Sequence, residues 1–177
     1  MSDHVRARIG GERDRAILFG SSLGGLTAAR VAERDARVAA LVLLAPAFRI
    51  AERWRARIGE DAWRAWRELG WLAIDDHAEK RKARVDFAFI EDAERVDGTT
   101  EEVLHDPARG WPDVRVPTLL IHGTRDETVG IDFSRVWAAG KRHVRIVEVD
   151  DGHELTASIG RIGDECDRFL APFLGTP

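Results

Sequence analysis

Residues 16–25 constrain this chain more than any other stretch, because a short apolar run there leads directly into the pattern Gly-x-Ser-x-Gly. The residues that follow, 23–33, favour a helix, so the order predicts a strand, a tight turn and a helix. Such a turn lifts the hydroxyl of Ser22 clear of the sheet and points the positive end of the helix at it. Gly20 and Gly24 are expected at positions where a Cβ would crowd the strand against the helix. Ser22 is therefore a candidate nucleophile.

The rest of the chain alternates between buried strands and amphipathic helices. Continuous apolar runs and strict alternation predict strands over residues 16–19, 38–45, 118–123 and 143–149. Apolar residues three or four apart predict helices over 23–33, 131–139 and 155–174, and the tail of a helix within 2–14. This alternation indicates an α/β fold with a parallel sheet of about four strands flanked by helices. No repeat or second domain is visible, so residues 1–177 are interpreted as a single domain.

Two of the predicted strands end in residues that could complete a site with Ser22. A serine hydroxyl is a poor nucleophile unless a base accepts its proton and a third group orients that base. The sequence His-Gly-Thr-Arg-Asp-Glu-Thr-Val follows one strand at 122–129, and Asp-Asp-Gly-His-Glu follows another at 150–154. Because parallel strands end at the same edge of a sheet, we expect these segments to lie near Ser22. The order Ser, Asp, His along the chain is also that of the α/β-hydrolase triad.

From residue 15 to its end the chain resembles the α/β-hydrolase superfamily, and within it the small YqiA-type bacterial esterases. The resemblance rests on Gly-Ser-Ser-Leu-Gly-Gly (20–25), on the segment 122–129 and on Asp-Gly-His (151–153). It implies that Ser22 is the nucleophile, Asp126 the acid and His153 the general base. It also implies that the backbone N–H of Leu23 lies in the oxyanion hole. The implied reaction is hydrolysis of a small acyl ester or thioester through an acyl-enzyme, without a cofactor or a metal.

Several other titratable residues are alternatives to these assignments. Three further acids near the site are expected to lie on the surface, namely Glu127, Asp132 and Asp151. His122 precedes a turn glycine and is expected to pack, or to form a hydrogen bond, beside the site. Four histidines without a motif are interpreted as solvated or hydrogen-bonded: His4, His77, His105 and His143. A metal site is not predicted at residues 75–79, because the spacing of Asp75, Asp76, His77 and Glu79 matches no known pattern of metal ligands.

An insertion over residues 47–112 lies between two predicted strands, where the superfamily carries its cap, and is expected to be helical. Apolar residues every fourth position over 50–66 predict two helices divided at Gly59, whereas 85–96 is interpreted as a helix and 97–112 as a loop. Five of the six tryptophans fall here: Trp54, Trp63, Trp66, Trp71 and Trp111. They either roof an apolar acyl pocket or simply pack the insertion onto the sheet, and the sequence leaves both interpretations open.

The superfamily places strands before its nucleophile, and this sequence reaches Ser22 without room for them. We therefore interpret the chain as N-terminally truncated relative to the family, and without the loop that supplies a second oxyanion donor. Loss of one such donor costs on the order of 10²- to 10³-fold in turnover, so weak activity is expected. Residues 16–19 would form an exposed sheet edge that invites a homo-oligomer. The alternative is a weak or inactive hydrolase fragment that acts as a binding or oligomerising module; a dehalogenase is disfavoured because most use a carboxylate nucleophile.

Composition limits the remaining possibilities. Twenty-seven basic and 31 acidic residues give a net charge of −4, so no nucleic-acid partner is predicted. The one cysteine, Cys166, excludes an internal disulfide and is expected to be an ordinary buried or half-buried residue. No apolar run reaches the roughly 18 residues of a membrane span, and residues 1–15 lack the apolar core of a signal peptide. A cytoplasmic location is expected.

Overall fold

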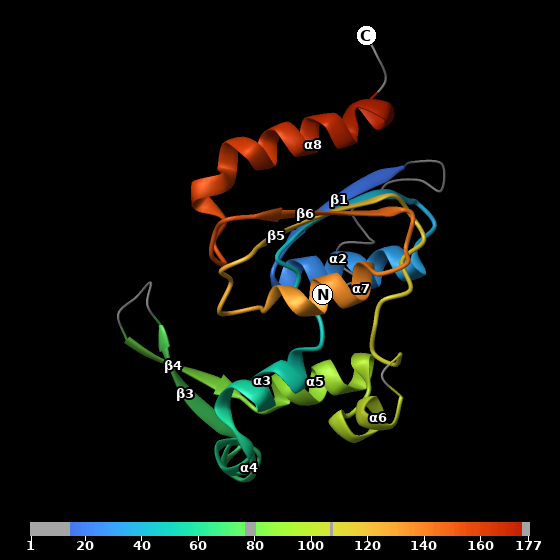
Figure 1. Ribbon diagram of the computed structural model, residues 1–177. Helices are drawn as coiled ribbons and strands as arrows, with labels where there is room; N and C mark the ends of the chain where they lie inside the picture. Colours follow the sequence, from blue (N-terminus) through green and yellow to red (C-terminus); the bar gives the residue numbers. More distant parts are fainter. Residues whose placement is uncertain (1–14, 77–80, 107, 175–177) are drawn as a thin grey trace. The chain divides into compact units, whose positions relative to one another are not determined.

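The computed structural model describes residues 15–76, 81–106 and 108–174, which form two compact units (Figure 1). One unit combines Met1–Phe48 with Pro112–Pro177, and the other is Arg49–Trp111. The helix tail predicted within residues 2–14 lies outside the described residues. Within the described part of the chain, no helix is both long and apolar enough to cross a membrane.

The first unit is built on a four-stranded parallel sheet, as predicted from the alternation of strands and helices. In sheet order its strands are β1 (Ala16–Ser21), β2 (Val38–Leu44), β5 (Thr118–Gly123) and β6 (Val144–Val149). The two central strands have both faces covered, which suits the continuous apolar run of β2 and the apolar residues Leu119–Ile121 of β5. No residue of the edge strand β1 is buried, and Phe19 is 57% exposed. The shared strand direction brings the ends of all four strands to one edge of the sheet.

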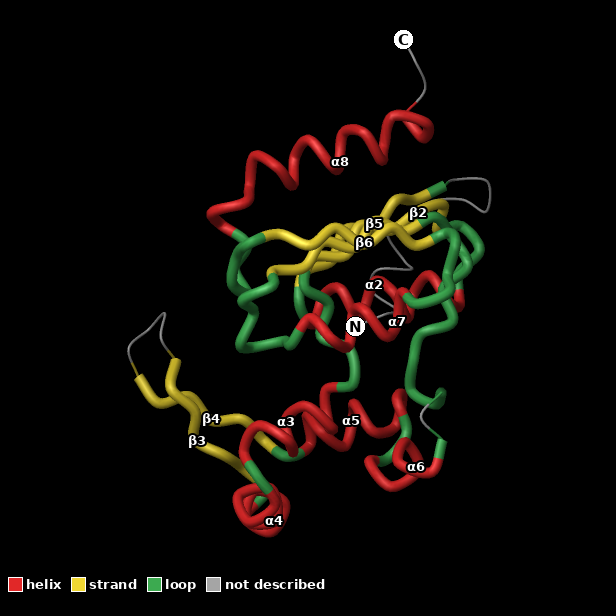
Figure 2. The backbone as a smooth tube through the Cα atoms, in the orientation of Figure 1, coloured by secondary structure: helices red, strands yellow, loops and turns green. Residues whose placement is uncertain are grey.

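Helices cover both faces of this sheet (Figures 1 and 2). On one face lie α2 (Leu23–Arg34) and α7 (Ile131–Ala138), and on the other lies α8 (Ile159–Leu174). The core between the sheet and α8 consists of eight buried residues: Val42, Ala45, Leu119, Ile121, Val147, Val149, Leu155 and Ile162. Cys166 packs against this cluster and is half-buried, as expected.

The closing helix begins later than the sequence pattern predicted. A short 3₁₀ turn, η1 (Thr156–Ser158), precedes α8, so the predicted start at Leu155 is wrong. Leu155 has a left-handed backbone with φ 55°, which cannot continue as a right-handed helix, and its side chain is buried. Ile159, the first residue of α8, is 71% exposed.

The second unit, the insertion, contains four helices and a hairpin among its described residues. Its elements are α3 (Ile50–Ile58), α4 (Glu60–Leu69), β3 (Trp71–Asp76), β4 (Arg81–Asp86), α5 (Ala88–Asp97) and α6 (Thr100–His105). The predicted break at Gly59 is confirmed. The hairpin was not predicted, and the helix expected over 85–96 begins only at Ala88, because Val85 pairs with Leu72 in the hairpin. The loop predicted over 97–112 contains α6, which a capping box between Thr99 and Glu102 starts.

Three tryptophans of the insertion, Trp54, Trp63 and Trp66, pack together in its core. Trp66 is 1% exposed, and its ring lies 5.2 Å from Trp54, 5.8 Å from Trp63 and 5.4 Å from Phe87. Its indole N–H donates to the carbonyl of Val85 at 3.0 Å, which ties α4 to the hairpin. These rings therefore hold the insertion together internally.

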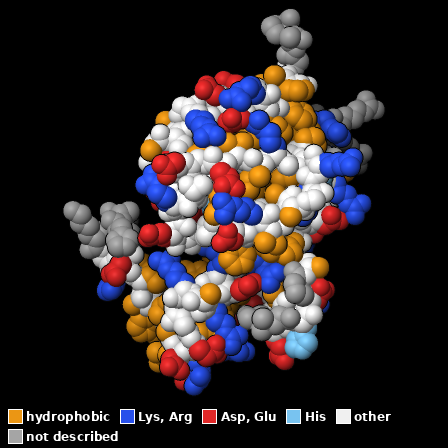
Figure 3. All heavy atoms as spheres, viewed as in Figure 1, with side chains coloured by type: hydrophobic (Ala, Val, Ile, Leu, Met, Phe, Trp, Pro, Cys, Tyr) orange, Lys and Arg blue, Asp and Glu red, His pale blue; other side chains and the backbone are white. Residues whose placement is uncertain are grey.

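Acidic and basic side chains are interspersed on the face that Figure 3 shows. Arg125 pairs with Asp150 at 2.6 Å, and Arg135 pairs with Glu148 at 2.7 Å. Exposed pairs of this kind contribute little to stability, because water and salt screen the attraction.

Candidate active site

Ser22 sits at the turn between β1 and α2 in a conformation that few residues other than glycine adopt. Its backbone angles are φ 51° and ψ −119°. The carbonyl oxygen of Ser22 accepts hydrogen bonds from the N–H groups of Gly25, Leu26 and Ala47 at 2.9–3.2 Å. Its own N–H donates to Leu44 at 2.9 Å, so the strained turn is fixed on both sides. The strand–turn–helix predicted around Ser22 is confirmed.

The glycines around Ser22 correct one expectation from the sequence. A Cβ on Gly20 would overlap the carbonyl oxygen of Gly24, as expected for a close strand–helix approach. A Cβ on Gly24, however, would meet nothing within 4 Å. The second crowded position is Gly25, where a Cβ would lie 2.9 Å from the Cβ of Pro46. The close contact therefore needs Gly20 and Gly25, because Gly24 points away from the strand.

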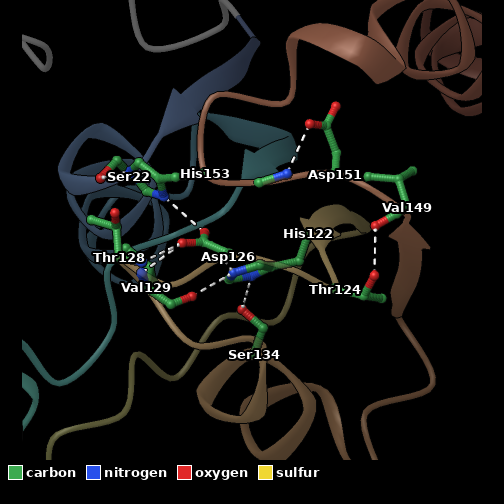
Figure 4. Close-up of polar contacts among 11 residues, drawn as sticks. Ser22, His122, Thr124, Asp126, Thr128, Val129, Ser134, Val149, Asp151 and His153 are labelled. Atoms are coloured by element: carbon green, nitrogen blue, oxygen red, sulfur yellow. Dashed lines mark hydrogen bonds and ion pairs between the residues drawn. The ribbon is translucent and has the colours of Figure 1, made fainter.

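The structure brings Ser22, His153 and Asp126 together, as Figure 4 shows. The Oγ atom of Ser22 lies 3.1 Å from Nε2 of His153. Nδ1 of the same ring lies 2.7 Å from Oδ2 of Asp126. The His153 side chain is 18% exposed, whereas the side chain of Asp126 is fully buried. Ser22 and His153 are thus half-buried, whereas the carboxylate of Asp126 is enclosed.

Contact between two loops holds His153 and Asp126 at this distance. A Cβ on Gly123 would overlap the carbonyl oxygen of Asp151, so only glycine lets the loop after β5 approach the loop after β6 this closely. The same carbonyl accepts the N–H of Arg125 at 3.0 Å. Position 123 of the segment 122–129 is therefore a glycine because a larger residue would not fit between the two loops.

Four donors surround the carboxylate of Asp126. Its Oδ1 accepts the N–H groups of Thr128 at 2.9 Å and Val129 at 2.7 Å. Its Oδ2 accepts from His153 and, at 3.2 Å, from Nε2 of His122. Burial opposes ionisation, but the hydrogen bonds from His122, Val129 and His153 outweigh it and hold the pKa of Asp126 well below its ordinary value.

His122 is fully buried beside the site, and the hydrogen bond expected for it is confirmed. Nε2 lies 2.7 Å from the carbonyl oxygen of Val129, and Nδ1 lies 2.8 Å from Oγ of Ser134 in α7. Ser134 is fully buried and was not among the residues predicted for the site. The sequence did hold a clue to Ser134. It lies three residues from both Ile131 and Trp137, so it is a polar residue on the apolar face of the predicted helix.

Asp151, expected on the surface, is buried, so that expectation is wrong. Its carboxylate accepts the N–H of Gly152 at 2.8 Å and the N–H of Ser158 at 2.9 Å. Burial opposes ionisation here too, but these hydrogen bonds lower the pKa of Asp151. Asp151 therefore fastens the loop that carries His153. Glu127 and Asp132 are exposed, as expected.

The remaining titratable candidates have local partners or lie outside the described residues. Nδ1 of His105 lies 2.9 Å from the carbonyl oxygen of Glu101, and Nε2 of His143 lies 2.8 Å from that of Val114, as expected. Asp75 pairs with Lys82 at 2.6 Å. Outside the described residues lie His4, His77 and Glu79. Among the side chains that the structure describes, no three His, Cys, Asp or Glu residues gather to hold a metal ion.

The backbone N–H of Leu23 is a further polar group at the site. Leu23 is the first residue of α2, and N–H groups in the first turn of a helix have no acceptor within the helix. This position, next to Ser22, is also where the positive end of the helix lies. The site thus combines a hydroxyl, an imidazole that can accept its proton, a carboxylate that orients the imidazole, and a donor for negative charge.

Comparisons with known proteins agree with this architecture. The family described as Uncharacterised protein family (UPF0227) matches residues 3–162, and no curated protein matches the chain. Alpha/beta hydrolase domain-containing protein 10 from mouse has a TM-score of 0.74 at 23% identity, over 96% of this chain and 67% of its own. The monoacylglycerol lipase of Paleococcus ferrophilus has a TM-score of 0.65 at 16% identity, over 96% of this chain and 73% of its own.

A third solved structure, the esterase domain of a Rhodothermus marinus protein, has a TM-score of 0.56 at 24% identity. It aligns over 88% of this chain and 60% of its own. The chain thus spans between 60% and 73% of the length of these three proteins. These TM-scores show that the chain shares the α/β-hydrolase fold, and at identities below 25% the likeness shows the fold alone.

Proposed function

This chain belongs to the Uncharacterised protein family (UPF0227) and has the α/β-hydrolase fold, and from that premise we propose that it is a serine hydrolase of carboxylic esters or thioesters. The observation that carries the proposal is the continuous line of hydrogen bonds from Ser22 through His153 to Asp126. Unrelated hydrolases use a serine, a histidine and an aspartate, hydrogen-bonded in this sequence, to activate the serine hydroxyl for attack on a carbonyl. Two of the structural neighbours, a monoacylglycerol lipase and an esterase domain, bear names that agree with an ester substrate.

In the proposed first step, Nε2 of His153 accepts the proton of Ser22 while Oγ attacks the carbonyl carbon of the substrate. Asp126 accepts the hydrogen bond from Nδ1–H and so stabilises the imidazolium that forms. The N–H of Leu23 donates to the developing oxyanion. His153 then passes the proton to the departing alkoxide or thiolate, which leaves as an alcohol or a thiol, and the acyl group stays on Ser22.

In the second step, water attacks the acyl group while His153 accepts a proton from the water. The bond between Ser22 and the acyl carbon breaks, the proton returns to Oγ, and a carboxylic acid leaves. Esters and thioesters fit this site better than peptides because their leaving groups depart more readily than an amine.

The test is hydrolysis of a p-nitrophenyl ester by the wild type and by Ser22→Ala. We expect the variant to lose all of the enzyme's turnover above background, and to lose covalent labelling by a fluorophosphonate probe. Ser21→Ala is a matched control, because this neighbouring serine is exposed at the end of β1 and has no place in the mechanism. Equal rates for Ser22→Ala and the wild type would remove Ser22 from the mechanism.

A second candidate function is association through the edge of the sheet, with weak or no catalysis. The observation that favours it is β1, which among the described residues has a strand neighbour on one side only and leaves Phe19 57% exposed. On this proposal the protein forms a homo-oligomer, and Phe19→Lys converts it to a monomer in size-exclusion chromatography with light scattering. A monomeric wild type that the fluorophosphonate probe labels would exclude this candidate in favour of the hydrolase.

A further inference from the structure

Two imidazole rings, and not one, donate to the same oxygen of Asp126. His153 contacts Oδ2 at 2.7 Å from the side of Ser22, and His122 contacts it at 3.2 Å from inside the fold (Figure 4). His122 is fully buried, so no substrate can reach it. His122 can therefore affect the reaction only through its contact with the carboxylate of Asp126.

The partners of His122 determine where its proton lies. The carbonyl oxygen of Val129, 2.7 Å from Nε2, can only accept a hydrogen bond, so Nε2 carries the hydrogen. In the neutral ring Nδ1 is then an acceptor, and the hydroxyl of Ser134 donates to it at 2.8 Å. Ser134 thus holds the ring in the tautomer that presents N–H to both Val129 and Asp126.

This ring also fixes the turn that positions the carboxylate. Val129 donates its N–H to Oδ1 of Asp126 and accepts from His122 through its carbonyl. Removal of His122 therefore leaves a buried carbonyl without its donor and leaves Oδ2 with one donor fewer. Both losses loosen the carboxylate at the point where it must meet Nδ1 of His153.

We propose that His122, held in one tautomer by Ser134, is a positioning residue that fixes Asp126 toward His153 and thereby sets the reactivity of Ser22. The inference rests on the proposed serine hydrolase. A misplacement of about 1 Å in a catalytic group can cost on the order of 10²-fold in rate. We therefore expect His122→Leu to slow the reaction of Ser22 by about 10- to 100-fold without a change in KM.

A double-mutant cycle on the full chain tests this, with the second-order rate of fluorophosphonate labelling at Ser22 as the readout. In the wild-type background His122→Leu slows labelling, whereas in an Asp126→Ala background the same change has almost no further effect. A merely structural role would slow labelling in both backgrounds. His122→Gln, which keeps a donor at the place of Nε2, is expected to restore most of the rate, and Ser134→Ala to give a smaller loss than His122→Leu.

His143→Leu is the matched control, because this half-buried histidine also bonds a backbone carbonyl and lies outside the site. It is expected to label at the wild-type rate. If His122→Leu does not fold, as judged by circular dichroism, Ser134→Ala and His122→Gln carry the cycle in its place. Wild-type labelling with equal rates in all His122 and Ser134 variants overturns this inference alone, whereas a wild type that is not labelled overturns the proposed function and this inference together.

Discussion

The two glycines of the Gly-x-Ser-x-Gly pattern differ in the room they leave for a side chain. A Cβ on Gly20 would overlap the backbone of α2, whereas a Cβ on Gly24 would meet nothing within 4 Å. We expect Gly20→Ala to displace the turn, to cost about 1–3 kcal/mol or more in the free energy of unfolding, and to abolish fluorophosphonate labelling. Gly24→Ala should fold normally and gain up to about 1 kcal/mol, since alanine suits a helix better than glycine. Equal labelling by both variants would contradict this account of the turn.

Asp126 links the stability of the fold to pH. Its folded pKa lies below that of an unfolded aspartate, about 3.9, so the unfolded chain binds more protons as the pH falls. The stability that the carboxylate contributes is therefore complete above about pH 5 and is lost progressively below pH 4. We expect Asp126→Asn to be much less stable than the wild type at pH 7 and the difference to shrink at pH 3. Urea unfolding at both values measures it, and a gap that stays constant would exclude the carboxylate as its source.

The sequence predicted the three side chains that the fold brings together at the candidate site, but not the residues that hold them in place. Ser22, Asp126 and His153 follow predicted strands and stand in recognisable local patterns, and the resemblance to α/β-hydrolases, not the spacing alone, implied their roles. Ser134 and Asp151 act through partners that only the folded chain brings near, on α7 and in the loop after β6. A hydrogen bond of this kind leaves no periodic signal in the sequence, apart from a polar residue on an apolar face.

At the scale of elements, strongly periodic segments were predicted and short ones were missed. The central strands β2 and β5 carry apolar runs, Val38–Leu44 and Leu119–Ile121, and apolar residues recur every fourth position in the helices around Gly59. The hairpin of β3 and β4 exposes many charged residues and alternates over only six residues a strand, so its signal is weak. The helix α6 did carry a readable start, because Thr99 and Glu102 have the spacing of a capping box.

The tryptophans of the insertion give a prediction at the same scale. Trp66 is 1% exposed among three aromatic rings, whereas Trp71 is 41% exposed and lies beneath the guanidinium of Arg84. We expect Trp66→Ala to cost about 3–5 kcal/mol in the free energy of unfolding of the insertion, and Trp71→Ala about 1 kcal/mol or less. Denaturant unfolding followed by near-ultraviolet circular dichroism separates the two. Similar losses for both would mean that the rings are not the core of this unit.

At the scale of the whole molecule, each compact unit brings together the two points at which the chain enters and leaves it. In the first unit the ring of Trp137 lies 4.8 Å from that of Phe48, and its indole N–H donates to the carbonyl of Pro112 at 3.0 Å. The chain leaves this unit after Phe48 and returns at Pro112, so one buried side chain of α7 joins both points. In the insertion, Arg49 lies 5.0 Å from the centre of the Trp111 ring, and these residues are its first and last.

This closure predicts that the first unit folds without residues 49–111. Because Phe48 and Pro112 both contact Trp137, a linker of about four glycine and serine residues, up to roughly 14 Å long, is enough to join them. We expect the shortened chain to keep the circular dichroism of an α/β fold and the fluorophosphonate labelling of Ser22, since the three hydrogen-bonded groups all belong to the first unit. Trp137→Leu in the same shortened chain should unfold at a lower temperature, because it removes the joint. A shortened chain that is unfolded would show that the sheet requires the insertion for its stability.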